Sequence, residues 1–314
     1  MVSAGFPSPG VTEEALVTSL PAVRFGTSDP IQGITKSRNG RSRAIQAPSR
    51  PDRSQMKPCS FRLQSGLGAL PHPRPCDRRS ERVTAMTDRI RNFLRQRRDD
   101  EPCVVVDLDI VRDNYTAFER ALPDTRVFYA VKANPAPEIL ELLARLGSSF
   151  DCASVAEIEM ALAAGAGPER ISFGNTIKKE RDVAAAFELG VRLFAVDCEA
   201  EVDKIARAAP GSQVFCRILC DGAGADWPLS RKFGCAPEMA PNVLEHAHRS
   251  GLIAHGVSFH VGSQQANVEA WDTALASAAG IFREMAERGI TLSMVNLGGG
   301  FPARYLKDMP GVPH

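Results

Sequence analysis

The sequence predicts an α/β fold in which parallel strands alternate with helices, in the form of a (β/α)8 barrel. From about residue 103 onward, short runs rich in β-branched and aromatic residues alternate with amphipathic stretches of helical spacing. The connections are short, and several helical stretches end in a glycine, which favours a left-handed helix cap. The alternation alone also fits a doubly wound sheet. The capping glycines are Gly147, Gly165, Gly190 and Gly289.

Seven strand candidates follow one another in the region 123–314. A (β/α)8 barrel needs eight strands, and the chain reaches His314 soon after the seventh, so we expect the eighth to be missing. Such an incomplete barrel has unpaired strand edges, which predicts marginal solubility. The candidates are RVFYAVK (126–132), SSFDCAS (148–154), RISFG (170–174), RLFAVD (192–197), QVFCRIL (213–219), IAHGVSFH (253–260) and LSMVNLG (292–298).

The segment 86–122 is predicted to hold a helix and a strand that lead into the barrel. It opens with MTDRIRNFLRQRRDDEPCVVVDLD, in which CVVVDLD is strand-like, and its last part, 109–122, shows apolar residues at helical spacing. Further helices are expected at 136–147, 155–165, 178–190 and 267–289.

Residues 1–85 differ in character from the rest of the chain. They contain 13 basic and 6 acidic residues, ten prolines and few apolar residues. Such a composition buries too little surface to offset the entropy of ordering, so we expect disorder. The segment could be a transit peptide, a nucleic-acid-binding tail, or translated sequence upstream of the true start. We favour a misplaced start, because ordered patterning begins at Met86 and the prolines disfavour one amphipathic targeting helix.

Composition indicates a cytoplasmic protein with neither nucleic-acid nor membrane partners. The net charge is +1, and no apolar run reaches the roughly 18 residues of a membrane-spanning helix. The sequence begins without a secretory signal, and its eight cysteines show no zinc-binding spacing, so no metal site is expected. We interpret the cysteines as reduced thiols, most of them in the core.

Several residues that can carry chemistry lie where predicted strands end, which in a barrel is the functional rim. Lys132 ends the first barrel strand in FYAVKANP. Burial there would lower its pKa and make the amine a nucleophile that can bond covalently to a cofactor carbonyl. The alternative is a lysine that extends from the strand end into water.

Charged residues follow on later strands. Asp151 ends the second strand and can pair with a cation on the rim, whereas Glu157 lies at a helix start, where the helix dipole alone favours an acid. Arg217 lies among apolar strand residues in QVFCRILC, so it needs an anionic or aromatic partner. That partner could be a ligand or a barrel carboxylate.

The sixth and seventh strands end in residues suited to a planar, phosphorylated ligand. A neutral His260 can lie flat against a ring, although a lone buried histidine is often only a core residue, and Ser263 can donate to a phosphate oxygen. The turn Gly298–Gly300, here called the glycine turn, lets the backbone approach an anion closely, although a GGG sequence can also be a plain flexible turn. Together with Lys132, these residues form the set that a pyridoxal-phosphate site needs.

From about Cys103 to Tyr305, the chain resembles the fold-type III pyridoxal-phosphate decarboxylases, whose barrel is of the alanine-racemase-like type. Five motifs occur in the family's order, namely FYAVKANP, FDCAS, RKFG, FHVGSQ and NLGGGFP. The resemblance implies the cofactor pyridoxal 5'-phosphate, an amino acid substrate and, for the full-length family, a homodimer.

The resemblance also implies roles for the residues around the ring. Lys132 corresponds to the lysine that carries the cofactor, and Asp151 and Glu157 to acids that engage this lysine once substrate has displaced it. Arg217 corresponds to an arginine near the pyridine ring, and His260 to the histidine stacked on it. Lys132 and His260 are therefore the expected catalytic residues.

Ser263, Gly298, Gly299 and Gly300 correspond to the family's phosphate binders. FDCAS followed by VAEIEMAL, and SFGNTIKK, are similar to the ornithine or lysine/ornithine decarboxylases. The resemblance thus implies a carboxy-lyase that converts L-ornithine to putrescine in polyamine biosynthesis. The alternatives are a diaminopimelate or other basic amino acid decarboxylase, and a non-catalytic regulatory homologue.

One part of the family pattern is absent from this sequence. The family's eighth strand carries a Glu-Pro-Gly-Arg motif that binds the pyridine nitrogen and the phosphate, and a C-terminal β-domain supplies a Cys-Asp pair and a tyrosine. Neither follows the seventh strand here. We therefore expect the C-terminal β-domain to be missing and this chain alone to have little or no decarboxylase activity.

Overall fold

The computed structural model describes residues 14–17, 86–98, 101–227 and 232–303. For residues 14–17 it describes the backbone only. Residues 1–13 and 18–85 lie outside the described residues. The expected disorder of residues 1–85 is therefore wrong for residues 14–17, which form a strand, and stays a prediction for the rest.

The strands form a closed barrel in which every neighbouring pair is parallel, which confirms the predicted α/β barrel and excludes the doubly wound sheet. The order around the barrel is β1-β10-β8-β6-β5-β4-β3-β2. All seven strand candidates are confirmed. The barrel strands are β1 Glu14–Val17, β2 Thr125–Ala130, β3 Ser149–Cys152, β4 Ile171–Phe173, β5 Leu193–Val196, β6 Gln213–Arg217, β8 Ile253–Ser258 and β10 Met294–Asn296.

The eighth position of the barrel is filled from the N-terminal side of the chain. Strand β1 pairs in parallel with β10, where Leu16 faces Asn296, and with β2, where Leu16 faces Arg126. The prediction of unpaired edges on an open barrel is therefore wrong. Among the described residues no strand follows β10, and the backbone groups of its free edge and of the neighbouring edge of β2 pair with β1.

Two apolar layers stabilise the barrel. Alternate residues of a strand face opposite sides, so Val127 and Tyr129 pack towards the helices while Phe128 belongs to a separate small cluster. That cluster joins Phe128 to Ala195, Phe215 and Met294, all almost fully buried. The larger core lies between strands and helices and includes most of the other buried aliphatic side chains.

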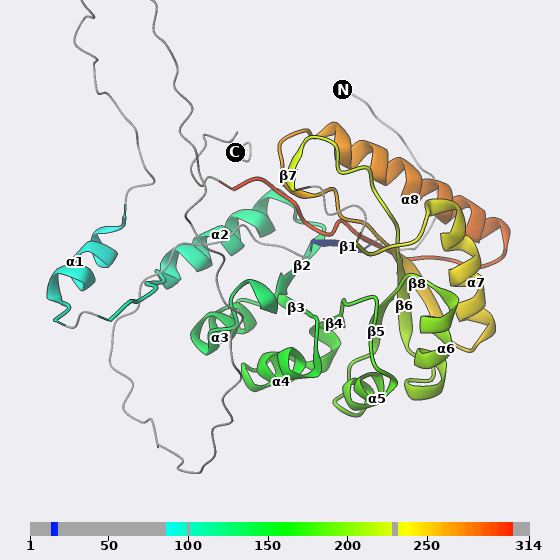
Figure 1. Cartoon of the computed structure of the whole chain (residues 1–314), viewed down its shortest axis with the longest axis horizontal. Helices are drawn as coiled ribbons and strands as arrows, with labels where there is room; N and C mark the ends of the chain where they lie inside the picture. The colour runs from blue at the N-terminus through cyan, green and yellow to red at the C-terminus, as the bar shows by residue number, and fades with distance from the viewer. Residues whose placement is uncertain (1–13, 18–85, 99–100, 228–231, 304–314) are drawn as a thin grey trace, which may run out of the picture. The chain divides into compact units, whose positions relative to one another are not determined.

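Helices surround the strands, as the ring of α2 to α8 in Figure 1 shows. The predicted helices are confirmed, and the four capping glycines all have a positive φ, between 78° and 94°. The α-helices are α1 Asp88–Gln96, α2 Leu108–Ala121, α3 Pro137–Arg145, α4 Val155–Ala163, α5 Glu180–Glu188, α6 Glu199–Ala208, α7 Ala240–Arg249 and α8 Glu269–Glu287. The short 3-10 helices are η1 Val131–Ala133, η2 Pro168–Arg170 and η3 Pro237–Met239.

Two details differ from the expected arrangement. The run 103–107 forms no strand, and its Val104 is 76% exposed. Within it only Val106 forms an isolated β-bridge, and none of the described strands pairs with the run along its length, as a strand would require. Beyond the barrel, β7 Ala225–Trp227 and β9 Ser263–Gln265 form a small antiparallel sheet.

The six described cysteines are all free thiols, as predicted. Three of them, Cys152, Cys216 and Cys235, are buried, so the expected core location holds for half of the described set. Cys59 and Cys76 lie outside the described residues. A search of the described helices finds none that is long and apolar enough to cross a membrane.

Candidate functional site

The sequence-predicted residues gather at one rim of the barrel. Because all barrel strands are parallel, their carboxyl ends lie at the same end. Asp151 is the next-to-last residue of β3, and Arg217 is the last residue of β6. Lys132, His260 and the glycine turn each begin two residues after a strand ends, namely after β2, β8 and β10. The tertiary structure thus brings together residues that are up to 168 positions apart (300 − 132).

Lys132 lies in the 3-10 turn η1, not within a strand, and its residue is exposed. The expected burial of this lysine is therefore wrong: β2 ends at Ala130, so the residue has already left the sheet. Its positive charge nevertheless acts on Asp151 and on His260, because it lowers the pKa of both side chains. Lys132 therefore lies within electrostatic reach of both groups.

Asp151 is a carboxylate in an apolar setting. Its pKa is raised to about 6, chiefly by burial. The charges of Lys132 and Arg217 oppose this rise, and the charge of Glu157 adds to it. Its carboxyl group rests against Gly174, where an added Cβ would come within 1.8 Å of the Asp151 Oδ1 atom. A side chain at position 174 would therefore displace this carboxylate.

Glu157 has a structural task at the start of α4. Its Oε2 accepts a hydrogen bond of 2.6 Å from the amide of Ala153, and its own amide donates to the Ser154 hydroxyl oxygen at 3.3 Å. This reciprocal arrangement satisfies amides that a helix start leaves unpaired. This geometry is consistent with the expectation that the helix start alone explains an acid here. The charge of Glu157 also raises the pKa of Asp151.

Arg217 lies between two carboxylates. Burial lowers the pKa of its guanidinium, and Asp151 and Asp197 raise it. Its guanidinium carbon also lies 5.7 Å from the centre of the Phe233 ring, within the range of a cation–π contact. The sequence predicted an anionic or aromatic partner, and the structure supplies both kinds.

His260 is held neutral by its surroundings. Burial, the largest cause, and the positive charges of Arg217 and Lys132 together lower its pKa to about 4. The Nδ1 atom accepts a hydrogen bond of 3.0 Å from the Gly262 amide, which leaves the proton on Nε2. At neutral pH this imidazole is therefore an uncharged ring, as a stacking role requires.

The glycine turn packs against the chain that follows β8. Gly298, Gly299 and Gly300 have φ of 68°, 88° and 91°, a region that favours glycine. A Cβ on Gly298 would come within 1.8 Å of the Phe259 carbonyl oxygen, so only glycine fits. The amide of Gly298 already donates to the Asn296 side chain at 2.9 Å. Ser263, at the start of β9, lies on the segment against which the turn packs.

Several residues around the site were missed at the sequence level. Gly174 makes room for Asp151, Asp197 faces Arg217 and accepts from the Gly234 amide at 3.1 Å, and Asn296 holds the glycine turn. Asp197 directly follows β5, so its place at a strand end was a usable signal. The described residues contain no group of three or more acids, histidines or cysteines suited to a metal ion.

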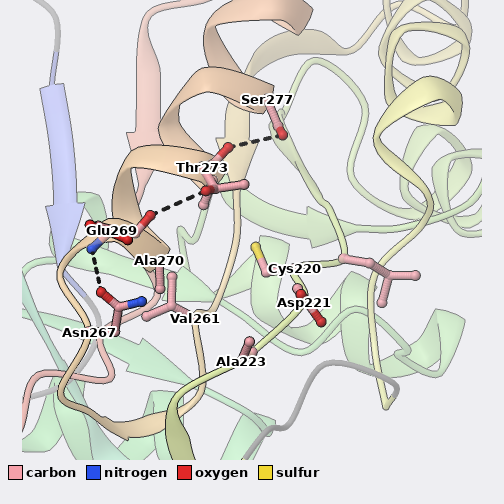
Figure 2. A pocket seen from close by; sticks show the side chains of 12 residues that line it. Cys220, Asp221, Ala223, Val261, Asn267, Glu269, Ala270, Thr273 and Ser277 are labelled. Atoms are coloured by element: carbon pink, nitrogen blue, oxygen red, sulfur yellow. Dashed lines mark hydrogen bonds between the residues drawn. The ribbon is translucent and has the colours of Figure 1, made fainter.

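A cavity of about 250 Å³ adjoins the site. Figure 2 shows Cys220 and Asp221 from the segment after β6 facing Val261 and the first turns of α8, where Thr273 and Ser277 donate along the helix. Its lining includes neither Lys132 nor the glycine turn. The cavity is therefore separate from the predicted cofactor site, although its lining residues Cys220 and Val261 also follow barrel strands at their carboxyl ends.

Comparison with known proteins defines the class that this fold and site belong to. The sequence model described as "Pyridoxal-dependent decarboxylase, pyridoxal binding domain" matches residues 108–313. The match covers well over half of the chain, so this chain belongs to the pyridoxal-dependent decarboxylase family.

Curated relatives agree with this assignment. The chain is 43% identical over 208 residues to a lysine/ornithine decarboxylase of Selenomonas ruminantium, covering 66% of this chain and 53% of that protein. It is 40% identical over 226 residues to a chloroplastic ornithine decarboxylase of Nicotiana glauca, covering 70% and 52%. It is also 35% identical over 217 residues to antizyme inhibitor 2 of Xenopus laevis, covering 69% and 48%. The chain thus spans about half the length of these relatives.

Solved structures share the fold. A lysine decarboxylase from Selenomonas ruminantium superposes with a TM-score of 0.64 at 40% identity, covering 70% of this chain and 57% of that one. A lysine/ornithine decarboxylase from Vibrio vulnificus, in complex with putrescine, gives 0.60 at 31% identity, covering 65% and 54%.

Proposed function

We propose that this chain is the cofactor-binding barrel of a decarboxylase, a carboxy-lyase that acts on a basic amino acid with pyridoxal 5'-phosphate. One observation carries the proposal. Lys132, Asp151, Arg217 and His260 lie at or just beyond the ends of four separate strands, and their charges influence one another's pKa values at a single rim. The glycine turn, which has no side chains, follows the strand next to that of His260 on the same rim.

The residues fit the cofactor at both of its ends. The glycine turn and Ser263 would hold the phosphate, because a positive φ and missing side chains let the backbone approach an anion. At the other end, Lys132 is an exposed primary amine that can bond to the aldehyde carbon. When bound, the cofactor supplies a pyridine ring that takes up the electron pair left by departing CO2.

The chain's own residues set the conditions for that chemistry. His260 presents an uncharged ring face, so stacking adds no positive charge above the pyridine. Asp151 is held near Lys132 and can accept a hydrogen bond from its amine once substrate has taken its place. Arg217 keeps Asp151 ionised more than burial alone would allow.

Within this class we propose L-ornithine as the substrate and putrescine as the product, a step of polyamine synthesis. The support is the similarity to ornithine and lysine/ornithine decarboxylases. The structure of SrLDC with PLP and cadaverine, and that of the Vibrio vulnificus enzyme with putrescine, show relatives that hold diamines. Diaminopimelate or lysine is the competing substrate, and a spectral titration of the cofactor-loaded chain with all three amino acids separates them, ornithine being expected to bind at the lowest concentration.

The direct test is covalent attachment to Lys132. Purified chain is mixed with pyridoxal 5'-phosphate, reduced with borohydride, digested and analysed by mass spectrometry. We expect one dominant modified peptide that contains Lys132, lost in Lys132→Ala and kept in Lys179→Ala, an exposed lysine on another segment. Equal labelling of the Lys132→Ala variant would contradict the proposal. Binding is the readout because the sequence contains no Glu-Pro-Gly-Arg motif.

A second candidate is a regulatory homologue without catalysis, favoured by the similarity to antizyme inhibitor 2. The two candidates differ in what happens at Lys132. A chain that folds but takes up no pyridoxal 5'-phosphate at this residue, although it keeps the glycine turn, would support the regulatory candidate.

We also propose a cytoplasmic location and a homodimeric full-length protein. The first rests on the composition, and the second on the resemblance to the family. Subcellular fractionation and analytical ultracentrifugation of the expressed protein test the two statements separately.

A further inference from the structure

Gln264 has an unusual backbone conformation for its residue type. Its φ is +56°, and no other non-glycine residue among those described has a positive φ. Side chains disfavour this left-handed region, and residues held there occur where the surrounding structure enforces the conformation, often at functional sites. The question is what holds Gln264 in place.

The side chain of Gln264 forms hydrogen bonds with the segment that follows the glycine turn. Its Nε2 donates to the carbonyl oxygen of Ala303 at 2.7 Å, and its Oε1 accepts from the amide of Ala303 at 2.8 Å. One primary amide thus satisfies both backbone groups of a single residue, as a neighbouring strand would do. The adjacent Gln265 amide donates to the Gly300 carbonyl oxygen at 2.9 Å.

These bonds join the two segments that supply the phosphate-binding groups of the proposed site. Ser263 directly precedes Gln264, and the glycine turn ends three residues before Ala303. The segments touch closely, since a Cβ on Gly300 would come within 2.3 Å of the Gly262 carbonyl oxygen. The two bonds to Ala303 thus add to the Gln265 bond in setting the spacing of Ser263 from the turn.

An aromatic cluster anchors the same segment to the helices. The Phe301 ring stacks on Trp271 of α8 with centres 5.2 Å apart, and meets Phe118 of α2 edge-on at 5.1 Å. This cluster fixes the segment to the outer layer, whereas the Gln264 amide fixes it to Ser263. The two contacts therefore have separable effects: one holds the segment in the fold, and the other sets the width of the anion site.

We propose that Gln264 is a positioning residue that holds Ser263 and the glycine turn at the spacing of a phosphate monoester, so that the site selects phosphorylated over unphosphorylated pyridoxal. This inference rests on the proposed function of the site. Gln264 itself touches no ligand in this scheme: it acts through the backbone of residues 263 and 300–303.

The test compares two ligands that differ only in the phosphate. Gln264→Asn retains a residue type that tolerates the left-handed region, but its shorter side chain does not reach Ala303. The dissociation constants of pyridoxal 5'-phosphate and of pyridoxal are measured for the whole chain by absorbance titration. We expect weakening on the order of tenfold for the phosphorylated ligand, from the loss of two hydrogen bonds, and no change for pyridoxal.

Three further variants make the result specific. Gln264→Glu keeps the acceptor for the Ala303 amide but loses the donor to its carbonyl, so it should weaken phosphate selectivity as well. Gln213→Asn makes the same chemical change at the start of β6, the opposite end of the barrel, and should leave both constants unchanged. Gln264→Gly, which accepts the backbone angle without cost, serves if Gln264→Asn folds poorly.

The outcomes are distinct. A selective loss of phosphate affinity supports the inference. Equal weakening for both ligands, or wild-type affinity in Gln264→Asn, overturns it and leaves the proposed function intact. If wild-type chain binds neither ligand at Lys132, both the proposed function and the role of Gln264 are overturned together.

Discussion

At the scale of single residues, two ionisable side chains of the site respond to burial in opposite ways. Burial raises the pKa of Asp151 to about 6 and lowers that of His260 to about 4, so both are pushed towards their uncharged forms. Between about pH 4 and pH 6, both side chains are therefore mainly uncharged. Their consequences for stability oppose one another as the pH falls.

His260 should make the fold less stable in mild acid. Its folded pKa of about 4 lies below the ordinary histidine value of 6.5, so the unfolded chain takes up the proton first and stability is lost as the pH falls from 6.5 to 4. Between pH 7 and pH 5 this amounts to about 2 kcal/mol. Denaturant unfolding at both pH values should show a smaller loss in His260→Gln than in wild type. An identical loss in both proteins would contradict the low pKa.

Asp151 should have the converse effect. Its folded pKa of about 6 lies above the ordinary aspartate value of 3.8, so the folded chain takes up the proton first and stability is gained as the pH falls from 6 to 3.8. The gain between pH 7 and pH 5 is about 1 kcal/mol. Asp151→Asn should therefore lose more stability than wild type over this range in the same unfolding experiment, and a smaller loss would exclude a raised pKa.

At the scale of elements, a buried lysine ties the β4–α5 connection to α6. The Lys178 side chain is fully buried, and its Nζ donates to the carbonyl oxygens of Ala195 and Asn175 at 2.6 and 2.8 Å. It also forms an ion pair of 3.1 Å with the buried Glu201, which in turn contacts Lys204. Burial lowers the pKa of Lys178 to about 8. This network sets the connection that carries Gly174, the residue that backs Asp151.

Removing this lysine should destabilise the barrel. Lys178→Ala leaves two carbonyl groups and a buried carboxylate short of a donor, which costs about 3 kcal/mol. Lys179→Ala removes the neighbouring, exposed lysine and should cost less than about 0.5 kcal/mol. Chemical denaturation of both variants checks the difference, and equal midpoints would show that the buried network adds no stability.

At the scale of the whole molecule, barrel closure depends on contacts across the full length of the chain. Strand β1, near residue 15, pairs with β10, near residue 295, and with β2, near residue 127. Both edges of β1 pair with a neighbouring strand through backbone groups. Closure of the barrel therefore depends on the amides and carbonyls of the four residues of β1.

A proline in β1 should therefore reopen the barrel. Leu16→Pro removes a backbone donor from the middle of the strand and exposes the edges of β2 and β10, which favours aggregation. Leu20→Pro places the same residue outside β1 as a control. Size-exclusion chromatography with light scattering should show more aggregate for the first variant. If both variants behave alike, β1 does not close the barrel in solution.

The local pattern of the sequence determined most of the fold and the positions of the site residues. Strands such as 213–217 and helices such as 155–163 were predictable because periods of two and 3.6 residues, and capping glycines, depend only on near neighbours. Strand ends then indicated Lys132, Asp151 and His260, because parallel strands present their carboxyl ends together.

The tertiary structure decided what depends on residues far apart in the chain. The place of β1 in the barrel, the burial of Lys178 beside Glu201 and the bond of Gln264 to Ala303 each join segments separated by more than 20 residues. The exposure of Lys132 likewise follows from where the sheet ends. Such contacts leave no periodic trace in the sequence, because their free energy arises only once the barrel has brought the partners together.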